Sequence, residues 1–320
     1  MQLTLEQTTK EIESGALLHI AGSEKLLLRL PKGNWIGGST EYFLTEDGGA
    51  VTDQLLNVTS IPFDEYKVSS YSADTIENIA ADAYDRGFTI VILPFNSRVH
   101  TKYALDSDEF EGLFTSPICG WIAGYNIMSD RQVAVSANGV EGKVSETDAV
   151  ALHIRLPEGR NARIGTINIF EPDTDSPVIT FKENSLDVDS CFVDGEEVNF
   201  AGYLREMNVN TNLPLVGDYS GADVSISFKE ITTKTVHLYA PVKAGVAYRF
   251  AKDVADYESA FQAKLAPIDH KNYVFACNCI LNFLYGRMQG KDIGGLYGPV
   301  TYGEVAWKVI NQTLVYVIVE

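Results

Sequence analysis

The stretch GPVTYGEVAWKVINQTLVYVIVE, residues 298–320, joins a glycine-containing turn to an apolar segment. The turn is Thr-Tyr-Gly-Glu at residues 301–304, and the apolar run at residues 314–319 has the length of a buried strand. Chain ends are usually frayed and polar unless packing holds them. We therefore expect the apolar run to be a core strand that, with the turn before it, completes the second half of the fold.

The composition is that of a folded, acidic protein. A chain of 320 residues exceeds the size at which one core usually keeps growing, so two domains are expected. Hydrophobic residues make up 45% and charged residues 21%, as in ordinary globular proteins. The net charge of −18 argues against nucleic acid as a partner and against anionic membrane surfaces, and it favours solubility.

The sequence predicts a cytoplasmic protein. Residues 1–15 carry acidic side chains where a signal peptide would have a basic start and an apolar core. No apolar run approaches the roughly 20 residues that cross a bilayer. Four cysteines in a chain of this length do not make a disulfide framework.

Capping residues and apolar periodicity predict six helices. The clearest begins with Asp74 as its N-cap, has Glu77 three residues later, and stops before Gly87. The segment NYVFACNCILNFLYGRM is apolar nearly all round, which is typical of a buried helix. The predicted helices are residues 4–15, 23–31, 72–88, 196–207, 256–265 and 272–288.

Strands alternate irregularly with these helices. Apolar strands are predicted at residues 16–22, 34–40, 89–95 and 116–127, and many short strands follow from about Gln132 onward. Strands and helices mixed without strict alternation indicate an α+β protein. The best linker candidate is PDTDSP, residues 172–177, where two prolines bracket acidic turn formers.

Two glycine turns carry a resemblance to a known family. WIGGSTEYF, residues 35–43, and LYGPVTYGEVAW, residues 296–307, each place a threonine two or three residues after a glycine. These turns resemble those of the FIST family, a two-part sensory module of bacterial signalling proteins and some F-box proteins. The ending is similar through the Asn-Gln-Thr at residues 311–313, whereas the front turn lacks the Gly-Glu that follows Ser-Thr in the family.

The resemblance implies an N-terminal half at residues 1–172 and a C-terminal half at residues 173–320. The two mixed sheet-and-helix halves would be candidates for a pseudo-repeat and would pack as one sensor module. The family is proposed to sense small molecules such as amino acids and to act with signalling partners. The expected function is therefore ligand binding in signalling, without turnover and without a cofactor.

The two turns supply the candidate ligand site. Ser39 and Thr40 would belong to its N-terminal part. Hydroxyls and a carboxylate beside flexible glycines can bind an ammonium or another polar headgroup, with aromatic side chains as apolar surface. The alternative is structural, with the threonine capping the turn and the glutamate satisfying backbone N–H groups. The C-terminal candidates are Tyr297, Thr301, Tyr302 and Glu304.

Arg249 is a further candidate because it lies among apolar residues in a predicted strand. A partly buried arginine generally needs a carboxylate partner. That partner would be either Glu304 or the carboxylate of a ligand. An amino acid with its carboxylate on Arg249 and its ammonium on Glu304 is the hypothesis that combines the two residues.

A hydrolase or lyase with a cysteine nucleophile is the alternative function. Cys119 stands beside a glycine that would permit close approach of a ligand, and Cys277 is the second candidate. On a helix, Cys277 and Cys279 could not face one metal ion, because two residues turn the chain by about 200°. The histidines are scattered and no metal-binding motif is present, so no metal site is expected.

Overall fold

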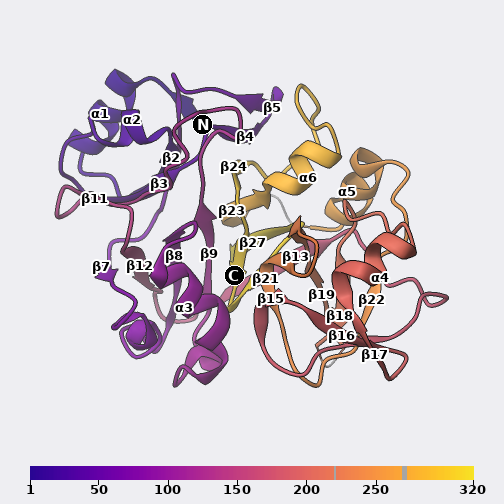
Figure 1. The fold of residues 1–320 in the computed structure, drawn as a ribbon. Helices are drawn as coiled ribbons and strands as arrows, with labels where there is room; N and C mark the ends of the chain where they lie inside the picture. The colour runs from indigo at the N-terminus through magenta and orange to yellow at the C-terminus, as the bar shows by residue number, and fades with distance from the viewer. Residues whose placement is uncertain (220, 269–271) are drawn as a thin grey trace.

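The computed structural model describes residues 1–219, 221–268 and 272–320. It confirms the mixed α+β class: helices are short, and most of the regular structure lies in mixed sheets. Figure 1 shows the chain running from the indigo elements at the upper left, through the purple ones below them, to the yellow ones at the centre. Three of the sheets share one arrangement of strands, which organises the whole molecule.

Each of these three sheets is built around a strand–helix–strand unit with parallel strands. A hairpin follows the second strand of the unit, and a closing strand then pairs antiparallel with the first. In unit 1 the elements are β2 (Leu18–Gly22), α2 (Glu24–Leu27), β3 (Trp35–Ser39), hairpin β4 (Tyr42–Thr45) and β5 (Gly48–Val51), and β6 (Leu56–Ser60).

Units 2 and 3 repeat this order. In unit 2 the elements are β8 (Gly87–Pro94), α3 (Arg98–Asp106), β9 (Ile118–Ala123), hairpin β10 (Ser136–Asn138) and β11 (Lys143–Ser145), and β12 (Ala149–Arg155). In unit 3 they are β23 (Tyr273–Cys279), α6 (Ile280–Tyr285), β24 (Gly298–Thr301), hairpin β25 (Glu304–Ala306) and β26 (Lys308–Ile310), and β27 (Thr313–Val319). The repeat is therefore threefold rather than twofold.

The three units are joined because the hairpin of each unit pairs with the sheet of another unit. Strand β4 pairs with β24, β10 pairs with β3, and β25 pairs with β9, each antiparallel. The exchange forms a closed cycle, so no sheet of the body is complete within its own unit.

A leading strand and a helical segment come before each unit. Each leading strand pairs antiparallel with the closing strand of its unit. The leading strands are β1 (Gln2–Leu3), β7 (Tyr66–Tyr71) and β13 (Ala162–Asn168), and the helical segments are α1 (Leu5–Glu13), the 3₁₀ turn η1 (Ile76–Ile79) and α5 (Tyr257–Leu265). Short 3₁₀ turns η2 (Ser107–Glu109) and η3 (Leu113–Thr115) follow α3.

Between β13 and α5 the chain forms an inserted subdomain with sheets of its own. Figure 1 shows these elements together at the lower right. They are β14 (Ile179–Thr180), β15 (Ser185–Val188), β16 (Ser190–Val193), β17 (Glu196–Asn199), α4 (Phe200–Glu206), β18 (Leu215–Asp218), β19 (Asp223–Ile226), β20 (Phe228–Ile231), β21 (Val236–Val242) and β22 (Tyr248–Phe250). The predicted linker at residues 172–177 lies where the chain enters this subdomain.

The proposed boundary between residues 172 and 173 therefore falls beside the insertion. It does not separate two sets of sheets, because β4 and β9 on one side pair with β24 and β25 on the other. Close packing across the body explains the paired glycines of the front turn. A Cβ at Gly38 would lie 2.6 Å from Ile92 and 2.8 Å from Trp121, so no side chain fits there.

Four predicted helices were wrong in part. Of residues 196–207 the first four form strand β17, and of residues 23–31 only Glu24–Leu27 form a helix. Residues 273–279 form strand β23 between β27 and β24, and only Ile280–Tyr285 is helical. A central strand covered on both faces is as apolar as a buried helix, so periodicity did not separate the two. Of the helix predicted at residues 72–88, only η1 is helical, and residues 87 and 88 begin strand β8. The hydroxyls of Ser72 and Thr75 accept hydrogen bonds from main-chain amides and so form a local turn before η1.

Other predictions were confirmed. Helix α1 begins at a Thr4 capping box in which the side-chain oxygen of Gln7 accepts a hydrogen bond from the main-chain amide of Thr4. The final apolar run is strand β27, buried along its length and paired with β13 on one side and β23 on the other. In the described part of the chain, no helix is long and apolar enough to cross a membrane.

Candidate functional site

The ends of the second strands of the three units meet near the centre of the body. Ser39, at the end of β3, donates its hydroxyl proton to the carbonyl of Gly124 after β9, at 2.6 Å. Thr40 Oγ1 donates to the carbonyl of Val300 in β24, also at 2.6 Å. The main-chain amide of Tyr302 donates to a carbonyl of β9 at 3.0 Å. The structure thus brings the two predicted turns together, through hydrogen bonds that join the units.

Glu304 is fully buried at the start of β25. Its Oε2 accepts hydrogen bonds from Thr313 Oγ1 at 2.8 Å and from the Thr313 amide at 3.3 Å. Its Oε1 lies 3.0 Å from Thr301 Oγ1. Burial raises the pKa of Glu304 to about 8, because removal from water penalises the charged form more than these hydrogen bonds stabilise it.

The surroundings of Thr301 agree with a protonated Glu304. Thr301 Oγ1 has one proton, yet it lies 3.2 Å from the carbonyl of Asn278, 3.0 Å from the carbonyl of Gly303 and 3.0 Å from Glu304 Oε1. If the carboxyl group carries a proton, it donates to the hydroxyl, and the hydroxyl proton is free for a carbonyl. Glu304 and Thr301 thus hold the turn together, as in the structural interpretation of this motif.

Arg249 does not pair with Glu304. It lies on β22 of the inserted subdomain, where its guanidinium donates to the carbonyls of Thr174 and Ser176. The carbonyls satisfy the partly buried cation without a carboxylate, which corrects the hypothesis that joined the two residues in one site. The positions of these main-chain oxygens depend on the tertiary fold, so the sequence does not identify them as partners of Arg249.

The two aromatic candidates lie at opposite ends of β24. Tyr297 precedes the strand, about 13 Å along an extended chain from Thr301, and its hydroxyl donates to Asp292. Tyr302 follows the strand and is buried, with its hydroxyl donating to the carbonyl of Tyr125 at 2.8 Å. Tyr302 therefore belongs to the centre, and Tyr297 does not.

Both nucleophile candidates are inside the core. Cys119 and Cys277 are 0% and 2% exposed, and their sulfur atoms contact main-chain carbonyls at 3.5 Å. Burial raises the pKa of both thiols above its ordinary value. A reactive cysteine is partly exposed with a lowered pKa, so the geometry favours a structural role for both. Across residues 1–219, 221–268 and 272–320, no group of three or more His, Cys, Asp or Glu side chains could hold a metal ion.

A pocket of about 130 Å³ opens beside Ser39 and Thr40. Most of its wall comes from the segments that follow β2, β3 and β9, at the carboxyl ends of parallel strands. Ligands of open α/β sheets bind at such ends, because the following loops converge there. We call it the β3–β9 pocket; it is lined by Ser23, Glu24, Lys25, Ser39, Thr40, Glu41, Asp53, Gly124, Tyr125, Asn126, Ser129, Arg131 and Val133.

The pocket lies beside β3 of unit 1, and the long connection after β9 of unit 2 supplies much of its wall. In units 1 and 3 the second strand passes to its hairpin through residues 40–41 and 302–303 alone, whereas residues 124–135 connect β9 to β10. Next to the two short connections the space is filled by rings. The Tyr302 ring lies against Gly124, where a Cβ would be 1.9 Å from it, and Tyr42 packs edge-on against Phe283 with ring centroids 5.6 Å apart.

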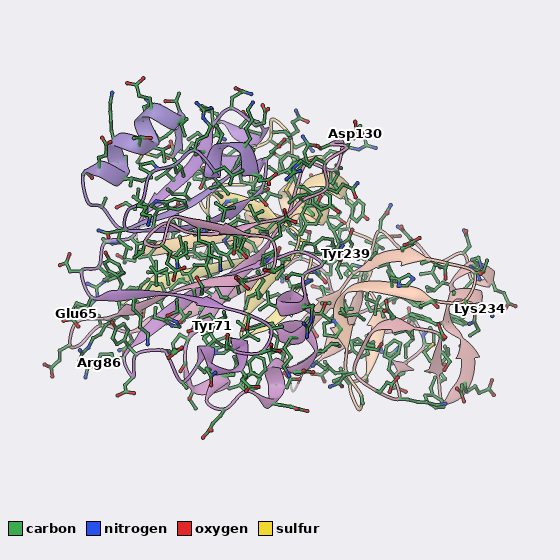
Figure 2. The ribbon with its side chains drawn as sticks, turned by 60° about the vertical axis from the view of Figure 1, so that its left-hand side comes forward. Glu65, Tyr71, Arg86, Asp130, Lys234 and Tyr239 are labelled. Carbon is green, nitrogen blue, oxygen red and sulfur yellow. The ribbon has the colours of Figure 1, made fainter. Side chains whose placement is uncertain are left out.

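Side-chain contacts tie the long connection, which we call the 124–135 loop, to unit 1. Asn126 Nδ2 donates to Glu41 Oε2 at 2.7 Å. Arg131 makes a bidentate pair with Glu24, at 2.8 and 2.7 Å. Figure 2 shows Asp130, on the same loop, projecting from the body at the side opposite to Glu65 and Arg86.

The sequence analysis missed the charged residues of this pocket. Ser39 and Thr40 were found, but Glu41, Asp53 and Arg131 were not. The available signal was the polar stretch YNIMSDRQ, residues 125–132, between two apolar strands. A long polar connection between core strands is more often functional than structural.

Comparison with known proteins identifies the family. The chain belongs to the family of unknown function DUF6976, whose model matches residues 3–320 and hence the three units and the inserted subdomain together. No curated protein matches the chain.

Proposed function

We propose that the protein is a ligand-binding module of the sensing type, which holds a small polar molecule in the β3–β9 pocket without converting it. The observation that carries this proposal is the 124–135 loop. Of the three equivalent connections it alone is long, and it builds a pocket on a rigid scaffold. Loops that vary on a repeated scaffold are where binding residues concentrate.

The charges of the pocket favour a small polar ligand. Acidic and basic side chains both line it, as required for a zwitterion. Amino acids are therefore the first compounds to test, and the resemblance of the two turns to FIST domains leads to the same choice. As a sensor, the module would act on a signalling protein. Its four buried cysteines, none in a disulfide, fit the reducing cytoplasm, where we place it.

A hydrolase or lyase reaction through Cys119 or Cys277 is the competing function. It requires a thiolate that a substrate can reach, and both thiols are buried with raised pKa values. Labelling at neutral pH with a small alkylating reagent separates the two functions. Rapid modification of either cysteine would favour the enzyme, and slow modification of both favours binding alone.

The ligand is sought by a thermal-shift screen with amino acids and common metabolites at millimolar concentration. A ligand at about 100 times its dissociation constant stabilises the native state by about 2.7 kcal/mol. In a chain of this size that raises Tm by several degrees at most. We expect one chemical class to produce a reproducible rise.

The control blocks the pocket covalently. Ser129 lines the pocket, and all four native thiols are buried, so a Ser129→Cys variant can be labelled at the new thiol alone. The labelled variant should lose the thermal shift, and the unlabelled variant should retain it. A shift that survives labelling would place the ligand elsewhere, and a flat screen would count against the proposal.

A further inference from the structure

Three buried hydroxyls that line the β3–β9 pocket have no proton left for a ligand. Ser23, Ser39 and Thr40 are each buried, and each donates its one hydroxyl proton to a main-chain carbonyl, at 3.3, 2.6 and 2.6 Å. A hydroxyl has one donor and two acceptor positions. These three groups can therefore offer a ligand only lone pairs. Ser39 and Thr40 have one each left, because they already accept from the amides of Val135 and Tyr42 at 2.8 and 3.2 Å.

The carboxylates of the pocket also accept and do not donate. Glu41 Oε2 receives the amide of Asn126, and Asp53 Oδ1 receives the amide of Gln54 at 2.6 Å. Among the described residues, no lysine or arginine forms an ion pair with Glu41 or Asp53. Two carboxylates lining one pocket thus lack a cationic partner.

The cations of the pocket are fewer and less available. Arg131 is already engaged by both oxygens of Glu24, and Lys25 is exposed. Three carboxylates against two cations leave the lining with an excess of negative charge. An anionic ligand would have only Lys25 as a free cationic partner in the lining and would face the lone pairs of the buried hydroxyls.

We infer that the ligand binds through a primary ammonium group, which donates its protons to Glu41 and to the lone pairs of the pocket. This inference rests on the proposed function and narrows its ligand class. An ammonium has three donors and no acceptor, which complements the buried hydroxyls without free protons and the Glu41 carboxylate without a cationic partner. A carboxylate on the same ligand would reach at most the exposed Lys25, so the ammonium is required and the carboxylate is dispensable.

Three small probes test the inference by calorimetric titration. Ethanolamine has the ammonium without a carboxylate, glycolate has the carboxylate without the ammonium, and glycine has both. We expect ethanolamine and glycine to bind with similar affinity and glycolate not to bind. Binding of glycolate, or of glycine with no binding of ethanolamine, would overturn the inference.

Charge-neutral variants locate the ammonium. Glu41→Gln should weaken ethanolamine binding about tenfold, as expected for loss of a charge-assisted hydrogen bond. Asp53→Asn, at an exposed position, provides a second test with little risk to folding. The matched control is Glu111→Gln, an exposed carboxylate outside the pocket, which should leave the affinity unchanged. Equal affinity in all three variants would contradict the assignment.

The broad screen and the amine probes together distinguish failure of the ammonium inference from failure of the proposed ligand-binding function. If the broad screen finds an anion or a neutral molecule whose binding is abolished by labelling at Ser129→Cys, the pocket is a ligand site and the ammonium inference fails. If neither amine probe binds and the broad screen is flat, the proposed function fails with it.

Discussion

The connection at residues 302–303 and the 124–135 loop occupy equivalent positions in units 3 and 2, yet only the loop forms a pocket. The first is closed by buried groups: the Tyr302 ring lies on Gly124, and Glu304 bonds Thr301 and Thr313. The second opens into a polar pocket. The exchanged hairpins hold both connections at their ends, so one can lengthen without loss of the sheet pairing around it.

The first residue after each of the three equivalent connections also differs in size. Glu304, Tyr42 and Ser136 each begin the first strand of an exchanged hairpin. All three are buried, but the first two carry a carboxyl group and a ring, and the third carries only a small hydroxyl. The first two contribute to packing at the centre, whereas the small residue follows the long loop.

The largest effect should come from the ionisation of Glu304. Its pKa is about 8 in the folded protein and near 4.5 when unfolded, so the folded state binds the proton more tightly. The stability it contributes is complete below pH 4.5 and is lost as pH rises toward 8. One pKa unit corresponds to about 1.4 kcal/mol, so the free energy of unfolding should fall by up to about 4 kcal/mol between pH 5 and 8. Urea denaturation at each pH measures it.

The control is Glu304→Gln, which reproduces the donor and acceptor of the protonated group. The difference between the two proteins is the quantity to compare, because His19, His100 and His153 are buried with lowered pKa values and act in the opposite direction below pH 6.5. Parallel curves for the two proteins would show that Glu304 is ionised when folded and that the closed connection is held differently.

The second effect concerns the packing between the two connections. A Cβ on Gly124 would lie 1.9 Å from Tyr302, so Gly124→Ala should lower the free energy of unfolding by about 2–3 kcal/mol through overpacking. Ser129→Ala, on the open part of the same loop, should change it by less than about 0.5 kcal/mol. Equal denaturation midpoints for the two variants would mean that the ring is not seated on Gly124.

The third change shortens the 124–135 loop and should have the smallest effect on stability of the three, but the largest effect on ligand binding. Replacing residues 126–132 by two glycines makes the loop resemble its short equivalents. Most side chains of this segment are exposed, and an exposed ion pair such as Arg131–Glu24 contributes about 0.2–1 kcal/mol. We expect the free energy of unfolding to change by about 1 kcal/mol and the ligand-induced thermal shift to disappear. A retained shift would move the site away from the loop.

Several elements could be predicted from the sequence because their causes are local. Helix α1 depends on a capping box that spans Thr4 to Gln7, and strand β8 on a continuous apolar run. The two glycine turns were found from their glycines and hydroxyls, and Ser39 and Thr40 do line the pocket. Their hydroxyl protons, however, are used by carbonyls that no local pattern identifies.

The sequence by itself determined the class of the fold, the ends of many elements and the final core strand, because capping, periodicity and apolar runs act over a few residues. Only the tertiary structure decided that β23 is a strand, that hairpins are exchanged among three units, and that Arg249 and Glu304 are apart. Strand β4 pairs with β24 from the far end of the chain. Such pairing depends on which edges remain free after the other strands have paired, and local propensity carries no information about that.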